Sequence, residues 1–418
     1  MADVSPERLI REFLLLGLRF DRIQDGYVDS FTGDPALRAQ VADEPAPDPV
    51  DLARMARTLL AELPSVPRED GFTELRAEYL RAHLVALECA ARKFAGEQVG
   101  FVDEVRAYFD VQIGPGDPQH YADAHRALEA ALGGTGSLAE RVADYRRSTE
   151  IPPERLAAAI DAFSSALRDR VRASYPLPDT ETVDYEIVTD KPWSGFNYYR
   201  GNYASTVAVN ADLKQQMANL PRLVAHESYP GHHTEHCRKE LRLVNGLGQT
   251  EQTIFLVNTP QCLMAEGLAD LALHAAVGSD WGAWAADIYA DLGLRFDGAR
   301  AEAISAAMAG LVDVRQDAAL MLHDEHRDPD DVVAYLSRWL LVDDVRARQM
   351  MKFLSSPLWR AYTSTYVEGY RLLRGWLDDR PDGVGMIERF GVLLDEPLIP
   401  STLPGRPGES AADQAPLP

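Results

Sequence analysis

The residues best suited to chemistry lie just past the middle of the chain, between Ala225 and His233. This segment reads Ala-His-Glu-Ser-Tyr-Pro-Gly-His-His, so three of the ten histidines fall within eight residues, beside a glutamate. His226 and Glu227 open like the motif H-E-x-x-H, in which two histidines one helical turn apart bind zinc and the glutamate activates water. Position 230, where that motif has its second histidine, is a proline. The segment is therefore either a modified metal site or a kinked helix with histidines on its surface.

Helix geometry leaves the second histidine ligand open. Residues four apart lie on the same side of a regular helix. His232 follows His226 by six residues and would point about 120° away, whereas His233 returns to the same side about 10 Å further along the axis. Pro230 cannot donate to the carbonyl of residue 226, and Gly231 adds backbone freedom. A two-residue bulge at this point, of the kind found at functional sites, would carry His232 back toward His226.

Glu266 is the candidate for a third ligand. It lies 40 residues after His226, in the otherwise apolar stretch 253–277. An unpaired carboxylate is costly to bury in such surroundings, which favours a partner for it. Two histidines and one glutamate, with a fourth position open to water, form a known type of catalytic zinc site. The alternative places Glu266 on a polar helix edge beside Asp270.

The two segments together resemble a large bacterial family of unknown function. Its motif is H-E-x-x-P-G-H-H followed by E-G-x-A, and the matching residues here are 226–233 and 266–269. The stretches 15–21 and 26–29 are also similar to the N-terminal region of that family. The family in turn resembles helical zinc peptidases of the neurolysin and thermostable-carboxypeptidase type, called gluzincins. This chain departs from the family pattern at Leu268 and Leu271, and at 234–236, which suggests a divergent branch.

The resemblance implies specific roles for these residues. It implies Zn²⁺ as the cofactor, with His226, His232 and Glu266 as its ligands and Glu227 as the base. It selects His232 over His233 because a Gly-His pair ends the motif in those peptidases. His233 is then expected to contact substrate or to support a ligand. The implied fold is a neurolysin-like helical body with a deep cleft and a short sheet beside the zinc-binding helix.

A tyrosine-rich segment at 362–374 is the second cluster of interest, and it is similar to a Y-x-x-G-Y element of the same family. Tyr362, Tyr366, Tyr370 and Arg374 share one helix face. A tyrosine hydroxyl can donate to a developing oxyanion, a role that we expect for Tyr366. An arginine can bind a substrate carboxylate, and we expect this role for Arg374, with Arg371 as the alternative. We also expect Tyr370, on the same helix face, to contact substrate. Aromatic packing with a solvated arginine is the competing interpretation.

The segment 195–203 is dense in aromatic and amide side chains, and Tyr203 is a further candidate for substrate binding. The resemblance implies that the following strand, 204–210, holds the substrate backbone by strand addition. An ordinary hairpin with packed tyrosines is equally compatible with this composition. A second histidine cluster, from His323 to His326, fits a solvated helix end better than a second metal site.

The surrounding elements predict a mainly α protein with a small sheet. Ser5-Pro6-Glu7 is a typical helix start, and strands are expected only at 184–188 and 204–209, as a pair. Helices are expected over most of the remaining chain, including one very long helical stretch at 284–323. We expect an N-terminal helical region at 1–180, a catalytic region at 181–400 that is continuous with it, and a flexible tail at 401–418.

Composition excludes several classes of partner. The chain has 418 residues and a net charge of −23, which argues against binding to nucleic acid or anionic membranes. Its three cysteines match no disulfide framework, and neither a signal peptide nor a membrane span is readable. These features predict a cytoplasmic protein, whereas the oligomeric state is not readable from the sequence.

Three functions are compatible with these features. The first is a zinc-dependent metallopeptidase that acts on short peptides, with Glu227 as the base. The second is a hydrolase of small amides or esters on the same scaffold, because a fold does not determine a substrate. The third is a non-catalytic helical interaction protein that lacks a metal. The retained Glu227 argues against the third, since a structural site needs no base.

Overall fold

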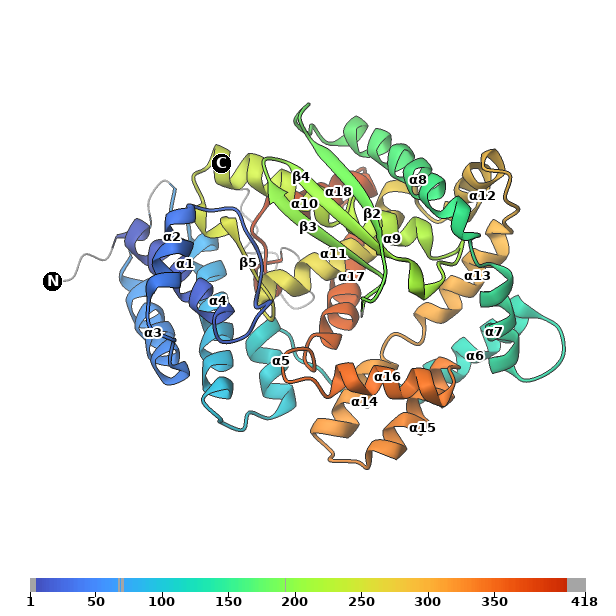
Figure 1. Ribbon diagram of the computed structural model, residues 1–418, viewed down its shortest axis with the longest axis horizontal. Coiled ribbons are helices and arrows are strands. Elements are labelled where there is room, and N and C mark those ends of the chain that lie inside the picture. The colour runs from blue at the N-terminus through green and yellow to red at the C-terminus, as the bar shows by residue number, and fades with distance from the viewer. Residues whose placement is uncertain (1–4, 67, 69–70, 192, 404–418) are drawn as a thin grey trace.

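The computed structural model describes residues 5–403 except 67, 69, 70 and 192. The chain forms an elongated, mainly helical body with a three-stranded sheet near its middle, as predicted (Figure 1). The N-terminal helices lie at one end of the body in this view, and the helices α12, α13, α6 and α7 lie at the other end. The expected fold class is therefore confirmed, and the deep cleft stays a prediction.

Eight helices precede the three-stranded sheet. They are α1 (Pro6–Asp21), α2 (Pro35–Asp43), α3 (Pro49–Glu62), α4 (Glu74–Phe94), α5 (Phe101–Phe109), α6 (Pro118–Leu132), α7 (Leu138–Ser148) and α8 (Pro153–Ser174). Four of them begin with a capping Ser or Asp followed directly by proline, and each cap side chain accepts a hydrogen bond from a backbone N–H of the first turn. Proline fits the first helical position because the N–H that it lacks would have no helical partner there.

The second half of the chain adds α9 (Leu220–Glu227), α10 (His232–Lys239), α11 (Pro260–Val277), α12 (Trp281–Asp291), α13 (Gly298–Ala309), α14 (Val314–His323), α15 (Pro329–Leu340), α16 (Asp344–Leu354), α17 (Tyr370–Asp378) and α18 (Met386–Asp395). Two π-helical turns, η3 (Glu240–Gly246) and η5 (Thr365–Gly369), adjoin α10 and α17. The long helical stretch expected at 284–323 is three helices. Gly293, at a φ of +72°, lies in the first of its two breaks, where a left-handed conformation favours glycine.

The sheet beside the central helices has the order β2-β4-β3. Its strands are β2 (Thr182–Val188), β3 (Gly195–Gly201) and β4 (Ala204–Asn210), with β2 parallel and β3 antiparallel to β4. The two predicted strands are thus present and paired. The prediction missed β3, because the aromatic segment 195–203 was assigned to the stretch before a strand rather than to a strand of its own.

A second, two-stranded sheet was not predicted at all. Strand β1 (Val28–Phe31) pairs antiparallel with β5 (Ile254–Leu256), more than two hundred residues away. Strands of three or four residues are too short to show a clear alternating pattern. This pairing joins the predicted N-terminal and catalytic regions. The boundary at 180 stays a prediction, and the chain crosses it as one connected core.

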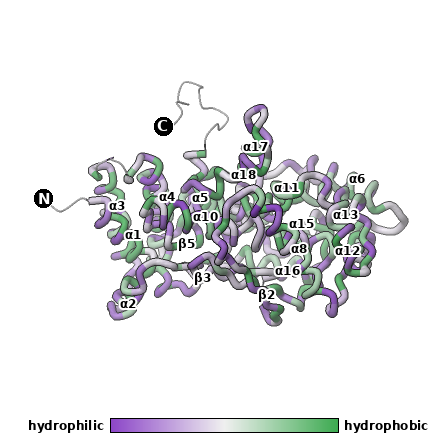
Figure 2. Tube along the Cα trace, turned by 90° about the horizontal axis from the view of Figure 1, so that it is seen from above, coloured by the Kyte–Doolittle hydropathy of each residue, from purple (hydrophilic) through white to green (hydrophobic). Residues whose placement is uncertain are grey.

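The helices are amphipathic and share that core. Hydrophilic and hydrophobic residues alternate along most helices (Figure 2), as expected when one face of each helix is buried. No helix among the described residues is long and apolar enough to cross a membrane. Of the predicted tail, residues 401–403 are ordered and Leu403 is buried. The remainder of that tail, 404–418, lies outside the described residues.

Candidate metal centre

The central motif folds as two helices separated by a sharp turn. Helix α9 ends at Glu227, and α10 begins at His232. Pro230, whose peptide bond with Tyr229 is cis, and Gly231 occupy the turn. A Cβ atom on Gly231 would lie 1.9 Å from the carbonyl oxygen of His226, so only glycine fits there. The predicted local bulge is thus a complete helix break, and it has the predicted effect of bringing His232 back to His226.

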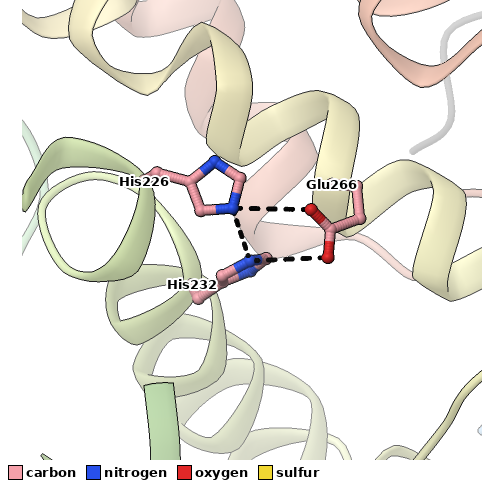
Figure 3. A group of neighbouring side chains, drawn as sticks. All are labelled: His226, His232 and Glu266. Carbon is pink, nitrogen blue, oxygen red and sulfur yellow. Dashed lines mark hydrogen bonds and ion pairs between the residues drawn. The ribbon is translucent and has the colours of Figure 1, made fainter. Parts of the chain in front are cut away.

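His226, His232 and Glu266 converge on one point from α9, α10 and α11 (Figure 3). Their ligand atoms all lie within 4.8 Å of one another. The two Nε2 atoms are 3.2 Å apart, and His226 Nε2 lies 3.4 Å from Glu266 Oε2. Ligands placed 2.0–2.1 Å from a tetrahedral zinc ion are about 3.3 Å apart, so these separations fit zinc. Glu266 Oε2 is also buried and faces His226 Nε2, so a metal ion bound between the two atoms would be held by both.

Asp270 orients the first histidine. Its Oδ1 lies 3.1 Å from His226 Nδ1, on the side of the ring opposite the triad. A carboxylate in this position keeps the proton on Nδ1 and directs the Nε2 lone pair toward a metal. Burial alone would lower the pKa of His226, but hydrogen bonds to Asp270 and Glu266 outweigh it and raise this pKa well above its usual value. Asp270 is therefore part of the centre rather than the polar helix edge of the alternative interpretation.

Glu227 lies beside the triad with a free carboxylate. Its side chain is buried, and its backbone carbonyl accepts a hydrogen bond of 2.6 Å from Asn197 of β3. Among the residues that the structure describes, none donates a hydrogen bond to its carboxylate. Desolvation raises the pKa of Glu227, partly offset by the positive charges of His226 and His232. A raised pKa makes the group a better proton acceptor at neutral pH.

Two tyrosines approach the triad from η5 and the turn before it. The Tyr362 hydroxyl donates a 2.6 Å hydrogen bond to Glu266 Oε1. The Tyr366 ring packs edge-on against Tyr362, with ring centroids 5.6 Å apart. Burial raises the pKa of Tyr366 well above its usual value, and the charges of Glu266 and Asp270 raise it further, so this hydroxyl keeps its proton.

Close contact between two glycines positions these tyrosines. A Cβ on Gly267 would lie 2.4 Å from the backbone of Gly369, and a Cβ on Gly369 would lie 2.6 Å from the carbonyl oxygen of Leu263. Helix α11 and the π-helical turn η5 therefore touch through their backbones. Because Gly267 follows Glu266 directly, the same contact sets the distance between the glutamate ligand and both tyrosines.

The expectation that His233 contacts substrate is wrong. Its side chain is fully buried, Nδ1 lies 2.8 Å from the Ser205 hydroxyl, and Nε2 lies 3.0 Å from Glu181 Oε1. Burial alone would raise the pKa of Glu181, but hydrogen bonds from His233, Tyr229 and Arg172 lower it to about 2. Glu181 thus anchors two residues of the motif turn, and His233 holds the start of α10 in place.

Three further residues predicted to contact substrate have partners within the protein. Tyr203 lies in the turn after β3, and its hydroxyl accepts a hydrogen bond from Asn245; the end of β3 at Gly201 is about 13 Å along the strand from Asn197. Arg374 is paired with Asp378 at 2.6 Å and acts on the pKa of His274, two helical turns beyond Glu266 on α11. Tyr370 is half-buried and packs against the core. A role of Tyr203, Arg374 and Tyr370 in substrate binding stays a prediction.

The strand expected to hold substrate is not at an edge. Strand β4 is the central strand, hydrogen-bonded to β2 and β3 on its two sides, so it has no free edge. Strand β3 is an edge strand and borders Glu227, since a Cβ on Gly195 would lie 3.1 Å from Glu227 Oε1. At the second histidine cluster, His323 Nε2 contacts the carbonyl of Leu354, and no second metal group is found among the described residues.

Three residues near the centre had no role assigned from sequence. Asp270 follows Glu266 by four residues, and Tyr362 precedes Tyr366 by four residues. This spacing places each pair on one helix face and could have indicated a role for Asp270 and Tyr362. Asp29, on β1, has no such signal in the sequence. Asp29 is exposed at its surface, and its pKa is raised to about 7 by partial desolvation and by the charges of Glu266 and Glu227.

No protein-family model and no curated protein sequence matches the chain. The solved structures that are similar to it include the following two. One is a protein from Colwellia psychrerythraea described as a lipoprotein, with 13% identity, a TM-score of 0.50 and coverage of 84% of this chain. This chain spans 65% of the length of that structure. The other is the M32 carboxypeptidase of Deinococcus radiodurans R1, with 12% identity, a TM-score of 0.40 and coverage of 93% of this chain and 90% of that one. The first likeness shows a shared fold, and the second supports no conclusion at that score.

Proposed function

We propose that this protein is a zinc-dependent hydrolase that acts as a peptidase on short peptides. The observation that carries the proposal is the convergence of His226, His232 and Glu266 beside the unpartnered carboxylate of Glu227. Three ligands and an adjacent base are the minimum set for metal-assisted hydrolysis of an amide. The orienting contact from Asp270 supports a metal role for His226, since a surface histidine needs no such partner.

Each residue of the site has its own role in the proposed hydrolysis. A Zn²⁺ ion held by the triad would polarise the scissile carbonyl and lower the pKa of a bound water toward 7. Glu227 accepts a proton as the water oxygen bonds to the carbonyl carbon, and it returns that proton to the amine nitrogen as the C–N bond breaks. Tyr366 donates a hydrogen bond to the oxyanion, a role that its raised pKa permits at neutral pH.

The sheet favours a peptide over a small amide or ester. Edge strand β3 offers unpaired backbone groups next to Glu227, and an extended peptide can add to such an edge through main-chain hydrogen bonds. A small amide has no extended backbone that could pair with this edge strand. A non-catalytic interaction protein is disfavoured because it would bury the Glu227 carboxylate without a hydrogen bond and without a reason.

Metal content and peptide hydrolysis of three proteins test this proposal. The wild type should contain about one zinc per chain by atomic emission and should cleave members of a short-peptide panel. His226→Ala should lose the metal. Glu227→Gln should keep the metal and lose at least about a thousandfold in kcat/KM, because the proton acceptor is gone while the ligands remain.

Absence of metal after incubation with zinc, or full activity of Glu227→Gln, would refute the assignment. Cleavage of acyl-amides or esters but of no peptide would favour the small-molecule hydrolase. Wild-type protein that binds zinc and cleaves neither class would point to the non-catalytic alternative.

A further inference from the structure

Helix α10 has one open side. Between His232 and Glu240, the only residues that are not buried are His232, His236 and Glu240, which are half-buried. These three residues lie four apart, so they form a single strip along the helix, with a rise of about 6 Å from each to the next. Since His232 belongs to the metal centre, His236 lies on the same open side, one helical turn away from the centre.

His236 is the member of this strip without a polar partner. Glu240 accepts hydrogen bonds from the Tyr199 hydroxyl and from the backbone N–H of Asn202. The ring of His236 is held by other rings: Tyr199 of β3 stacks on it with centroids 4.6 Å apart, and Phe255 of β5 meets it edge-on at 5.7 Å. Among the residues that the structure describes, no hydrogen bond or ion pair engages either ring nitrogen. The ring is thus fixed in place while both nitrogens stay available.

Every second residue of β3 directs its backbone to the open edge of the sheet. In an antiparallel pair, residues that bond to the partner strand alternate with residues whose N–H and C=O groups face away from it. The backbone N–H of Asn210, at the end of β4, donates to the carbonyl of Ser194 at 2.9 Å, which places the even-numbered residues on the bonded side. Gly195, Asn197 and Tyr199 therefore present their N–H and C=O groups at the open edge.

This edge runs from the proposed base to His236. At one end, a Cβ on Gly195 would lie 3.1 Å from Glu227 Oε1. At the other end, Tyr199 stacks on His236. The interval from Gly195 to Tyr199 is about 13 Å along an extended strand, whereas the rise along α10 from His232 to His236 is about 6 Å. A peptide paired with this edge would therefore reach His236 about two to four residues from its scissile bond.

We propose that His236 binds the main chain of an extended peptide by a hydrogen bond, about two to four residues from the scissile bond. This inference rests on the proposed function, and it names extended oligopeptides rather than dipeptides as the substrate class. A neutral imidazole has one N–H donor and one acceptor nitrogen, and a peptide main chain has groups that match both. Packing alone would account for the position of the ring, but not for two free nitrogens beside an open strand edge.

Probes anchored on the metal test this inference without hydrolysis. A hydroxamate chelates zinc, and it can be placed at the C-terminal end of one to four alanines or, as a malonyl hydroxamate, at their N-terminal end. Zinc-loaded Glu227→Gln protein is titrated calorimetrically with both series of probes. We expect the affinity to rise about tenfold in one of the two series once the alanine chain reaches His236, which is the effect of one well-placed hydrogen bond.

Variants of His236 in the same protein separate hydrogen bonding from packing. His236→Phe and His236→Leu both lack the ring nitrogens but pack differently, so whichever binds the one-alanine probe normally carries the comparison. That variant should lose the gain from longer probes. His236→Gln should keep part of the gain, because its amide has donors and an acceptor. The matched control is His120→Phe, which replaces an exposed histidine of α6 and should leave every affinity unchanged.

The outcomes separate this inference from the proposed function. No gain with length in either series, or an undiminished gain in His236→Phe or His236→Leu, would overturn the role of His236 and leave the metal centre standing. Length-dependent binding without hydrolysis of any peptide by the wild type would keep that role and refute the peptidase. If zinc-loaded protein bound no probe at all, the proposed metal centre would be refuted and the inference would fall with it.

Discussion

At the scale of single residues, the centre depends on side chains that the motif does not contain. Asp270 orients His226, and Tyr362 donates to Glu266, so two of the three triad residues are held by a second side chain. Such partners commonly change metal affinity by 10- to 100-fold when they are removed. The two tyrosines have different contacts, and this difference predicts different consequences of their loss.

Removing the hydroxyls of Tyr366 and Tyr362 separately should distinguish catalysis from metal support. Tyr366→Phe should lower kcat by about a hundredfold or more with little change in KM, because an oxyanion donor acts in the transition state. Tyr362→Phe should weaken metal binding, because Glu266 loses its hydrogen bond. Steady-state kinetics at saturating zinc and competition with a chelator measure the two effects. The reverse pattern would exchange the roles assigned here.

At the scale of elements, the contact between α11 and η5 determines the shape of the centre. Gly267 and Gly369 allow the two backbones to touch, and Glu266 directly precedes Gly267 while Tyr366 lies three residues before Gly369. Turns of π-helix are uncommon and often occur at functional sites, which is consistent with the place of η5 here. A methyl group at this contact would have to separate the two elements.

We therefore expect Gly267→Ala to destabilise the protein by about 1–3 kcal/mol and to weaken metal binding, because the new Cβ meets backbone rather than a mobile side chain. Chemical denaturation and metal titration measure these effects. The matched control is Gly375→Ala in α17, where a Cβ would meet nothing within 4 Å. It should be neutral or stabilising by up to about 1 kcal/mol, since alanine is the better helix former. A neutral Gly267→Ala would show that the contact can relax.

At the scale of the whole molecule, the N-terminal helices are part of the same structure as the centre. Strand β1 pairs with β5, which leads into α11, and Arg76 of α4 forms two 2.7 Å hydrogen bonds with Glu251, just before β5. The side chains of this ion pair are 6% and 0% exposed. A buried charge left without its partner is strongly destabilising, so this link can be tested directly.

Arg76→Ala should lower the stability by about 3–5 kcal/mol, because it leaves Glu251 buried and unpaired. Urea unfolding followed by fluorescence measures the change. Arg57→Ala, which breaks the more exposed Arg57–Glu88 pair, is the control and should cost about 1 kcal/mol or less. If both variants lost the same small amount, the N-terminal helices would not be fastened through Glu251.

The motif, the helix starts and the mainly α class were readable from the sequence, because each depends on local chemistry. Caps followed by proline, helical periodicity and the Pro-Gly break act between neighbours in the chain. Selection of His232 rested on resemblance, and the structure supplies its geometric reason in the turn at Gly231. The third strand, the β1–β5 pair and the burial of His233 depend on partners that are distant in sequence, and no local pattern reports such partners.

The sequence by itself determined which residue types were available for a metal centre and which of them are brought close by the turn between two helices. Only the tertiary structure decided which arginines are paired with acids, which strand lies at the sheet edge, and which tyrosine reaches Glu266. The physical reason is that pairing, edge position and reach depend on distances between separate elements. Those distances depend on how side chains pack and on the contact between the backbones of Gly267 and Gly369. Each of these involves several positions that are distant in the sequence.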